Sequence, residues 1–193
     1  MFSPDGRILA VGTAGRTVLL WDVHDPGHPT LLSLPLREAT SPVFAIAFSP
    51  DGRTLATADN AIRFWDVTDP HHPTPLAAPL TGPDRTIWSL AFAPDGRTLA
   101  AGTGDGNIWL WATTDPHHPT LLATLPAHNG SVYTVAFDTV DGILVSGGAD
   151  RTTHLWNIDA GRVAAFVCAT AGDRITPSEW ARYVPDKRYQ PPC

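Results

Sequence analysis

The sequence predicts an all-β protein made of four copies of one unit, because two sequence motifs recur in step along it. The first motif is a tryptophan that closes a strand-like run, at Trp21, Trp65, Trp111 and Trp156. The second is a Phe-Ser/Ala-Pro-Asp-Gly turn that starts at Phe2, Phe48 and Phe92, with a version one residue longer at Phe137. A fixed period of roughly 40 to 45 residues is typical of propellers and solenoids, in which each unit buries its apolar face against its neighbours. We therefore predict a β-propeller arc of about four blades.

Each turn motif is predicted to form a hairpin corner between the first two strands of its unit. Proline presets φ for the second position of a tight turn, and Asp-Gly tolerates the positive φ that hairpins need. Runs of apolar and β-branched residues on both sides of the corner are typical of strands. Before the corner these runs cover residues 43–48, 87–92 and 132–137. After it they cover residues 9–11, 55–57, 99–101 and 144–146.

The run that ends in tryptophan is predicted to be the third strand, and a fourth follows a shared connector. The connector has the pattern Asp-Pro-x-His-Pro-Thr and covers residues 25–30, 69–74 and 115–120. Four strands per unit is the composition of one propeller blade. The predicted divisions are an incomplete first blade at 1–36, blades at 37–80, 81–126 and 127–168, and a tail at 169–193.

With these motifs the chain resembles the WD40 repeat family over about residues 1–168. The family's Trp-Asp dipeptide occurs at Trp21-Asp22 and Trp65-Asp66, and weaker versions occur at Trp111-Ala112 and Trp156-Asn157. The resemblance implies a propeller scaffold without catalytic activity that binds a protein or peptide. WD40 rings commonly have seven blades, so an arc of four, with the first incomplete, implies a ring completed by sequence before Met1 or by homo-oligomerisation.

The tail is predicted to carry a short helix that caps the last blade. Thr176 and Glu179 form a capping-box pattern with Pro177 at the first helical position. An apolar stripe follows on one face, at Trp180, Tyr183 and Val184. The helix is expected to cover the end blade, as terminal repeats require, with a partner-binding helix as the alternative.

Similar tails occur in bacterial WD40 proteins whose front portions are NTPase or kinase modules. That resemblance implies that this chain is the C-terminal part of a longer bacterial protein. It also gives an alternative function: the sensor or regulatory region of a larger signalling NTPase or kinase.

Charge and composition exclude several partners. With 13 basic and 19 acidic residues the chain carries a net charge of −6, whereas nucleic-acid binding calls for a clustered positive face. No apolar run approaches the roughly 18 residues that suggest a membrane span, and the first residues do not resemble a signal sequence. We expect no nucleic acid or membrane contact and a cytoplasmic location.

The two cysteines, Cys168 and Cys193, bracket the tail. A disulfide between them could pin the tail to the last strand. In a reducing compartment free thiols are the expectation, and two thiols are too few for a structural zinc site.

The last unit places four residues where the WD40 family has a hydrogen-bonded tetrad: His128, Ser146, Asp150 and Trp156. The resemblance implies that Ser146 accepts the indole N–H of Trp156, and that His128 links Ser146 to Asp150. This role is structural and not catalytic. The earlier units lack parts of the tetrad, with Val11 and Ala101 in place of the serine, so we expect them to rely more on apolar packing.

No catalytic, cofactor or metal site is predicted. The glycine-rich segment 102–106 is expected to be a turn, because the chain returns to a strand after it and does not open a phosphate-binding helix. The connector histidines, including His71 and His117, are expected to be solvated loop residues.

The predicted partner-binding residues lie at one mouth of the central channel. Phe44, Trp88 and Tyr133 each follow the first residue of an innermost strand. Arg85 and His128 lie close upstream and would add polar contacts. Large aromatic side chains dominate interface energetics; the alternative is that these three pack between blades, as we expect for Trp109.

Overall fold

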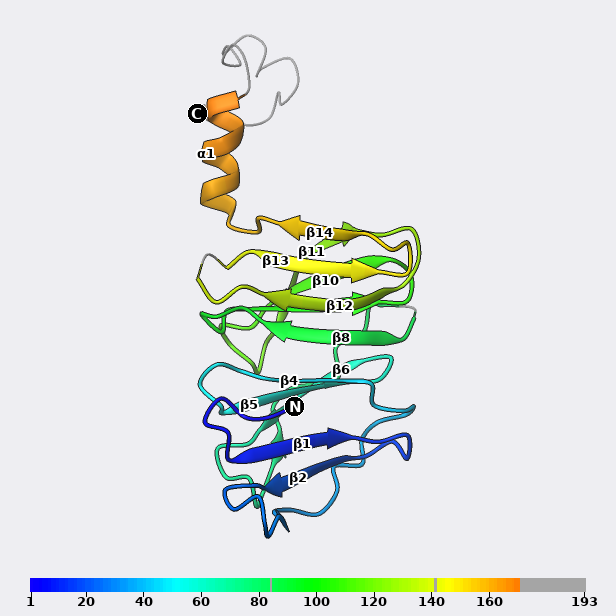
Figure 1. Ribbon diagram of the computed structural model, residues 1–193, viewed down its shortest axis with the longest axis vertical. Coiled ribbons are helices and arrows are strands. Elements are labelled where there is room, and N and C mark those ends of the chain that lie inside the picture. Colours follow the sequence, from blue (N-terminus) through cyan, green and yellow to red (C-terminus); the bar gives the residue numbers. More distant parts are fainter. Residues whose placement is uncertain (84, 141, 171–193) are drawn as a thin grey trace. The chain divides into compact units, whose positions relative to one another are not determined.

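The computed structural model describes residues 1–83, 85–140 and 142–170 (Figure 1). The chain divides into two compact units, Met1–Trp156 and Asn157–Cys193. All of the described strands lie in the first unit, and the described part of the second unit contains one helix.

The first unit contains four antiparallel sheets, which confirms the predicted all-β class. The first sheet has three strands, β1 (Ile8–Gly12), β2 (Val18–Asp22) and β3 (Thr30–Leu31). The second has four, β4 (Ala45–Phe48), β5 (Thr54–Ala58), β6 (Ile62–Asp66) and β7 (Thr74–Pro75). The third has β8 (Ile87–Phe92), β9 (Thr98–Thr103), β10 (Asn107–Ala112) and β11 (Thr120–Pro126). The fourth has β12 (Val132–Phe137), β13 (Leu144–Gly148) and β14 (Thr153–Trp156).

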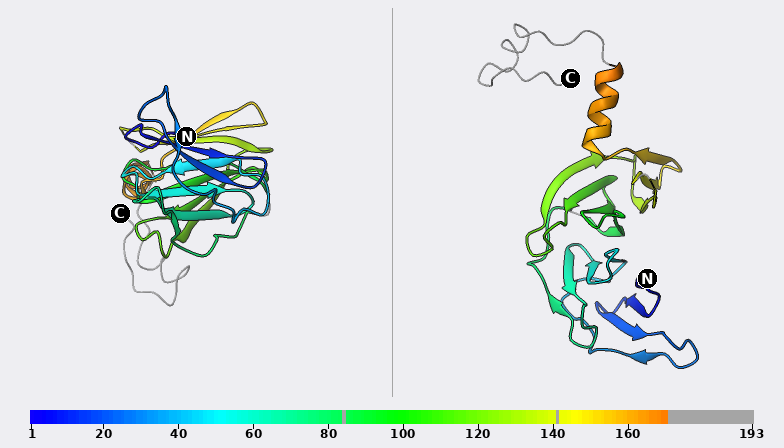
Figure 2. Two further views of the ribbon diagram at one scale, coloured as in Figure 1. Left: turned by 90° about the horizontal axis from the view of Figure 1, so that it is seen from below. Right: turned by 90° about the vertical axis from the view of Figure 1, so that its left-hand side faces the viewer.

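Within the first unit the sheets follow one another in chain order, as propeller blades do (Figure 2). Strands β4, β8 and β12 each form one edge of their sheet, and β8 contacts both β4 and β12. These three are the innermost strands that the sequence predicted. Because they all run in the same direction, their N-terminal ends gather at one end of the unit and the Pro-Asp-Gly corners gather at the other.

The corners repeat the same local structure from blade to blade. In the first two, the serine hydroxyl donates to the aspartate two residues later, at 2.6 Å in both the Ser3–Asp5 and Ser49–Asp51 pairs. The glycine N–H returns to the backbone carbonyl three residues back, and Gly52 has φ of 72°. Glycine adopts this left-handed conformation without steric cost. The corner motif therefore encodes a type I turn followed by a left-handed residue, a common hairpin connection.

The second blade contributes to two apolar cores, one on each face of its sheet. Leu55 and Trp65 pack with first-blade residues such as Leu20. Phe64, on the other side, packs with third-blade residues such as Ile87. Every residue of β5 is buried. This burial on both faces identifies the second blade as an interior blade of the repeat.

The helix α1 (Ala160–Thr170) lies where the sequence predicted the end of the fourth blade. Asp159 caps it, since its carboxylate accepts the backbone N–H of Arg162 at 2.9 Å. The sequence prediction extended that blade to residue 168 with four strands, whereas the described fourth sheet has three. Alanines favour helix over strand, and this local preference opposes the repeat pattern. The helix predicted from Thr176 lies outside the described residues.

Cys168 is disulfide-bonded, so its interpretation as a free thiol is wrong. That interpretation rested on cellular compartment, which does not determine whether the fold places two sulfurs together. The other cysteine, Cys193, lies outside the described residues. No helix in the described ranges is long and apolar enough to cross a membrane.

Candidate functional site

Three aromatic side chains from consecutive blades form a continuous row, which we call the aromatic row: Phe44, Trp88 and Tyr133. The ring centroids of Phe44 and Trp88 are 5.0 Å apart, and those of Trp88 and Tyr133 are 6.0 Å apart. The second pair meets edge to face at 69°, an arrangement that aromatic quadrupoles favour. The structure thus brings together the three aromatics that the sequence singled out.

The backbone presents the central and last rings through β-bulges. The pairing of β8 with β9 shifts between Ile87 and Ser89, which leaves Trp88 as the extra residue. The pairing of β12 with β13 shifts in the same way around Tyr133. A bulge redirects one side chain out of the regular alternation of a strand, and bulges are frequent beside functional sites. Both blades therefore use the same irregularity to turn an aromatic residue toward the row.

The aromatic row is substantially exposed. Phe44 is 52% exposed and Tyr133 is 56% exposed, while Trp88 between them is partly buried. Large apolar side chains exposed together, and not scattered singly, are typical of binding surfaces. Arg85 is exposed beside Trp88, since both side chains lie within 3.4 Å of where a β-carbon on Gly104 would stand. The backbone end of the Arg85 side chain therefore lies near Trp88.

The indole N–H of Trp88 is buried and has no hydrogen-bond partner among the described residues. An unpaired buried donor costs roughly 1–3 kcal/mol. The Trp109 indole N–H is likewise buried and without a partner among the described residues, so the unpaired donor does not distinguish a binding role for Trp88 from packing between blades.

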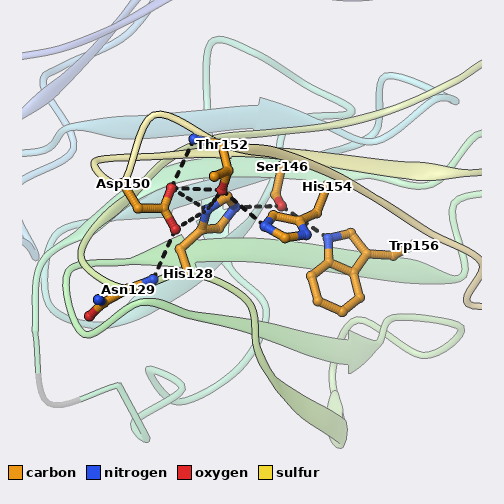
Figure 3. Close-up of polar contacts among 7 residues, drawn as sticks. All are labelled: His128, Asn129, Ser146, Asp150, Thr152, His154 and Trp156. Carbon is orange, nitrogen blue, oxygen red and sulfur yellow. Dashed lines mark hydrogen bonds and ion pairs between the residues drawn. The ribbon is translucent and has the colours of Figure 1, made fainter.

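The four predicted tetrad residues lie together in the last blade (Figure 3). The Trp156 indole donates to Ser146 Oγ at 3.0 Å, and Ser146 Oγ lies 2.8 Å from His128 Nε2. His128 Nδ1 lies 2.9 Å from Asp150 Oδ1. If His128 is protonated on Nδ1, every hydrogen bond points one way along the chain, from indole to serine to imidazole to carboxylate.

A serine, a histidine and an aspartate at these distances match the connectivity of a hydrolase triad. However, Ser146 is fully buried and its oxygen already accepts the Trp156 indole. A nucleophilic oxygen must reach its substrate, and this one lies inside the blade. The arrangement holds the blade together and offers no surface for attack.

Asp150 accepts further hydrogen bonds around its carboxylate. The backbone N–H groups of Asn129 and Thr152 donate to it, each at 3.0 Å, and the Thr152 hydroxyl donates at 2.8 Å. His128 first, and then Thr152 and Asn129, lower the pKa of Asp150 well below its ordinary value, against a smaller opposing effect of burial. The carboxylate is therefore ionised at neutral pH.

The second blade has a polar network that the sequence did not predict. The Trp65 indole donates to Thr57 Oγ1 at 3.1 Å, so Thr57 takes the role that Ser146 has in the last blade. Asp59 is 1% exposed and forms a 2.7 Å ion pair with Arg63. It also accepts hydrogen bonds from Thr40, from Ser41 and from the Ala61 backbone.

The expectation that the earlier blades rely more on apolar packing therefore missed a polar network in this blade. The equivalence was hidden because the turn after Thr57 is shorter. Thr57 pairs with Arg63 in the sheet register just as Ser146 pairs with His154. Thr57 and Ser146 are therefore equivalent by their position in the strand pairing, although their spacings along the sequence differ.

The third blade replaces polar contacts with aromatic stacking. Trp109 stacks on Trp111 of the same strand, with centroids 5.8 Å apart and planes 17° apart. It also packs against the core that the second and third blades share, in line with the expectation that it packs between blades. In the glycine-rich segment the chain turns from β9 into β10, where Thr103 donates to Asp105 and to the backbone carbonyl of Asn107. This segment is a strand connection, as predicted.

The connector histidines do more than the sequence suggested. His72 and His118 each pair with the aspartate three residues earlier, at 2.9 and 2.8 Å. His71 Nδ1 lies 3.0 Å from the carbonyl oxygen of Leu32, and His117 Nδ1 lies 3.0 Å from that of Leu76. Each of the latter two contacts joins one blade to the preceding one.

A shallow depression of about 570 Å³ lies between the first two blades, at the opposite ends of the inner strands from the aromatic row. Charged side chains of both signs line it, including Asp5, Arg53 and His71. Its open and mixed character gives no convergent set of groups for chemistry. The aromatic row is therefore the stronger candidate site.

A comparison with known protein families identifies four repeats in the same part of the chain. The family model described as WD domain, G-beta repeat, matches residues 1–22, 31–66, 74–112 and 119–157. The chain is 39% identical over 59 residues to eukaryotic translation initiation factor 3 subunit I of Mycosarcoma maydis, covering 30% of this chain and 17% of that protein. A chain in the crystal structure of the mitotic checkpoint complex is similar with a TM-score of 0.69 and 24% identity, covering 81% of this chain and 47% of that one.

The chain thus spans less than half the length of either relative. At 24% identity the likeness to the checkpoint-complex chain shows the fold alone. The comparisons give no specific support for the alternative function, a regulatory region of a larger bacterial NTPase or kinase.

Proposed function

Because the chain belongs to the WD40 repeat family, we propose that it is a non-catalytic propeller scaffold that binds a protein or peptide at the aromatic row. The observation that carries the proposal is the exposed, continuous contact of Phe44, Trp88 and Tyr133 across three blades. Bulges turn two of these rings out of the regular alternation of their strands. Exposed aromatic side chains in such clusters are the residues that most often dominate binding energy.

The geometry favours an extended peptide segment. Side chains on one face of an extended strand recur at roughly 6.6–6.8 Å, somewhat more than the 5.0 and 6.0 Å ring spacings of the row. Apolar side chains at alternate positions of the segment would each lie over one ring. An acidic residue in the segment would be able to pair with Arg85, which is exposed and whose β-carbon lies near Trp88.

The test is a peptide selection followed by titration. Peptides are selected from a random library for binding to the full chain, and the best binder is titrated against single variants. Tyr133→Ala and Phe44→Ala are each expected to weaken binding by about 5- to 30-fold, the range for interface residues worth about 1–2 kcal/mol. Arg85→Ala should weaken most strongly those peptides that carry a carboxylate.

Leu34→Ala is the matched control, because Leu34 is 87% exposed but lies away from the inner strands. Both aromatic variants change exposed side chains, so their melting temperatures should stay near that of the unmodified protein. Selected peptides that bind all variants equally would contradict the proposal.

We propose, in addition, that the open sides of the first and last sheets are covered in the working protein, by further blades or by a second copy of the chain. Two apolar residues support this: Leu31 in the first sheet is 47% exposed and Leu155 in the last is 71% exposed. The first and last sheets also have three strands each, against four in the two interior sheets.

A further inference from the structure

A cluster of metal-ligating side chains lies at the end of the last blade, outside the aromatic row. His128, Asp150 and His154 each offer one ligand atom, and these atoms all lie within 4.8 Å of one another. The rings of His128 and His154 meet edge to face, with centroids 4.7 Å apart (Figure 3). The sequence pattern did not point to His154, because only the strand register places it beside the tetrad.

One oxygen atom, the hydroxyl of Thr152, lies within hydrogen-bond distance of all three candidate ligand atoms. The Thr152 hydroxyl oxygen lies 2.8 Å from Asp150 Oδ1, 2.9 Å from His154 Nε2 and 3.2 Å from His128 Nδ1. Three donors with metal-binding chemistry therefore point at one small polar group. Thr152 is exposed, so rotation of its side chain would free this point.

The protonation of His128 is compatible with an ion at that point. A neutral imidazole that binds a metal through Nδ1 carries its proton on Nε2, where Ser146 Oγ lies 2.8 Å away and can accept it. Metal-bound histidines generally donate their other ring N–H to such a partner, which fixes the ring. Metal binding would therefore change the tautomer of His128 and keep its contact with Ser146.

In the second blade, the buried aspartate of the network is paired with a positive charge from the neighbouring strand. There Arg63 occupies the position equivalent to His154, two residues before the blade tryptophan, and its guanidinium pairs with Asp59. The equivalent residues in the first and third blades, Leu19 and Trp109, have no such chemistry. In the last blade a cation bound between His154 and Asp150 would supply the positive charge that Arg63 supplies in the second.

We propose that His128, Asp150 and His154 form a binding site for a divalent transition metal ion, with Zn²⁺ as the best match. Two imidazoles and one carboxylate suit Zn²⁺, and three protein ligands leave a fourth position for water or the Thr152 hydroxyl. Zn²⁺ bonds of about 2.0–2.2 Å place tetrahedral ligand atoms roughly 3.3–3.6 Å apart. At present the candidate ligand atoms lie up to 4.8 Å apart, while His128 Nδ1 and Asp150 Oδ1 are only 2.9 Å apart. Binding therefore needs that pair to open slightly and the most distant atoms to move closer.

The test is a Zn²⁺ titration of the full chain in competition with a chromogenic chelator, without reductant so that Cys168 stays in its disulfide. The unmodified protein should bind one equivalent. His154→Ala should weaken binding by at least about 10- to 100-fold, the loss typical of removing even an outer-shell partner. Because His154 lies outside the tetrad, this variant should fold normally without metal, and Zn²⁺ should raise the melting temperature of the unmodified protein only.

His118→Ala is the matched control, since His118 also pairs with an aspartate, Asp115, but has no third ligand beside it in the part of the chain that the structure describes. It should bind Zn²⁺ like the unmodified protein. Three results would overturn the proposal: no saturable binding, equal binding by His154→Ala and the unmodified protein, or equal losses in the two histidine variants, which would place the ion at surface histidines.

Discussion

At the residue scale, the tryptophans that close the third strands need an acceptor for a buried indole N–H, and two blades supply it with a hydroxyl. Ser146 serves Trp156, and Thr57 serves Trp65. The first of these pairs could be predicted because the last blade has the full sequence spacing of the tetrad. The second could not, because the shorter turn changes the spacing while the strand register stays the same. Sequence distance is thus a weaker guide than the position across the sheet.

Removing the central hydroxyl of the tetrad should destabilise the last blade. Ser146→Ala leaves the indole of Trp156 and one nitrogen of His128 without their partner, and each stranded group costs about 1–3 kcal/mol. His128→Ala should also lower the melting temperature, because it removes the link to Asp150. Thermal unfolding followed by circular dichroism measures both. Thr153→Ser, an exposed change in β14, the strand that contains Trp156, should have little effect. An unchanged melt for His128→Ala would contradict the network.

At the element scale, strands were predictable and their irregularities were not. The predicted runs 87–92 and 132–137 match β8 and β12 in full, since apolar runs bounded by turn residues are a local signal. The bulges at Trp88 and Tyr133 depend on the pairing with the next strand, which no local pattern encodes. For the same reason the aromatics of the candidate site could be named from sequence, but their contact with one another could not.

The segment 160–170 shows the opposite case, in which local preference and repeat pattern disagree. The repeat predicts that the fourth blade continues there, as the blades before it do after their connectors. The structure has a helix capped by Asp159. Alanine-rich composition is a strong helix signal. A fourth strand would instead have to pair with β14, the edge strand of the fourth sheet.

The polar network around Asp59 in the second blade should be sensitive to acid. Burial alone would raise the pKa of Asp59, but hydrogen bonds from Arg63, Ala61 and Thr40 together outweigh it and hold that pKa well below its ordinary value. A carboxyl with a lowered pKa in the fold contributes stability above its unfolded pKa, about 3.9, and loses it as pH falls toward the folded pKa. The contribution of Asp59 should therefore be complete at neutral pH and should decline below about pH 4.

Melting temperatures measured from pH 7 to pH 2 test this decline. Asp59→Asn should be less stable at neutral pH by about 3 kcal/mol or more, because it leaves the buried Arg63 without its counter-charge. The gap between this variant and the unmodified protein should narrow below pH 4. Glu38→Gln, a change at an exposed carboxyl, controls for the general effect of removing an acid. A gap that stays constant down to pH 2 would contradict the assigned role of Asp59.

At the scale of the whole first unit, burial is uneven from blade to blade. The second blade lies between two cores, with Phe64 1% exposed on one side and Leu20 fully buried on the other. The fourth blade has β14 at one edge of its sheet, where Leu155 is 71% exposed. Repeat proteins gain stability from each interface between neighbours. The interior blades should therefore be the most stable part of the unit, and the end blades should depend on additional contacts.

Self-association is the whole-molecule prediction that follows from these uncovered end blades. An edge strand with free N–H and C=O groups beside exposed apolar side chains is a template for pairing with another chain. Light scattering on the isolated chain should give a mass above 20.7 kDa that rises with concentration. Leu155→Lys places a charge on the edge strand and should lower that mass, whereas Val140→Lys, an 87% exposed position outside the strands, should not. A constant mass of one chain together with a sharp thermal transition would mean that the end blades are stable uncovered, and would contradict ring completion both by further blades and by a second copy.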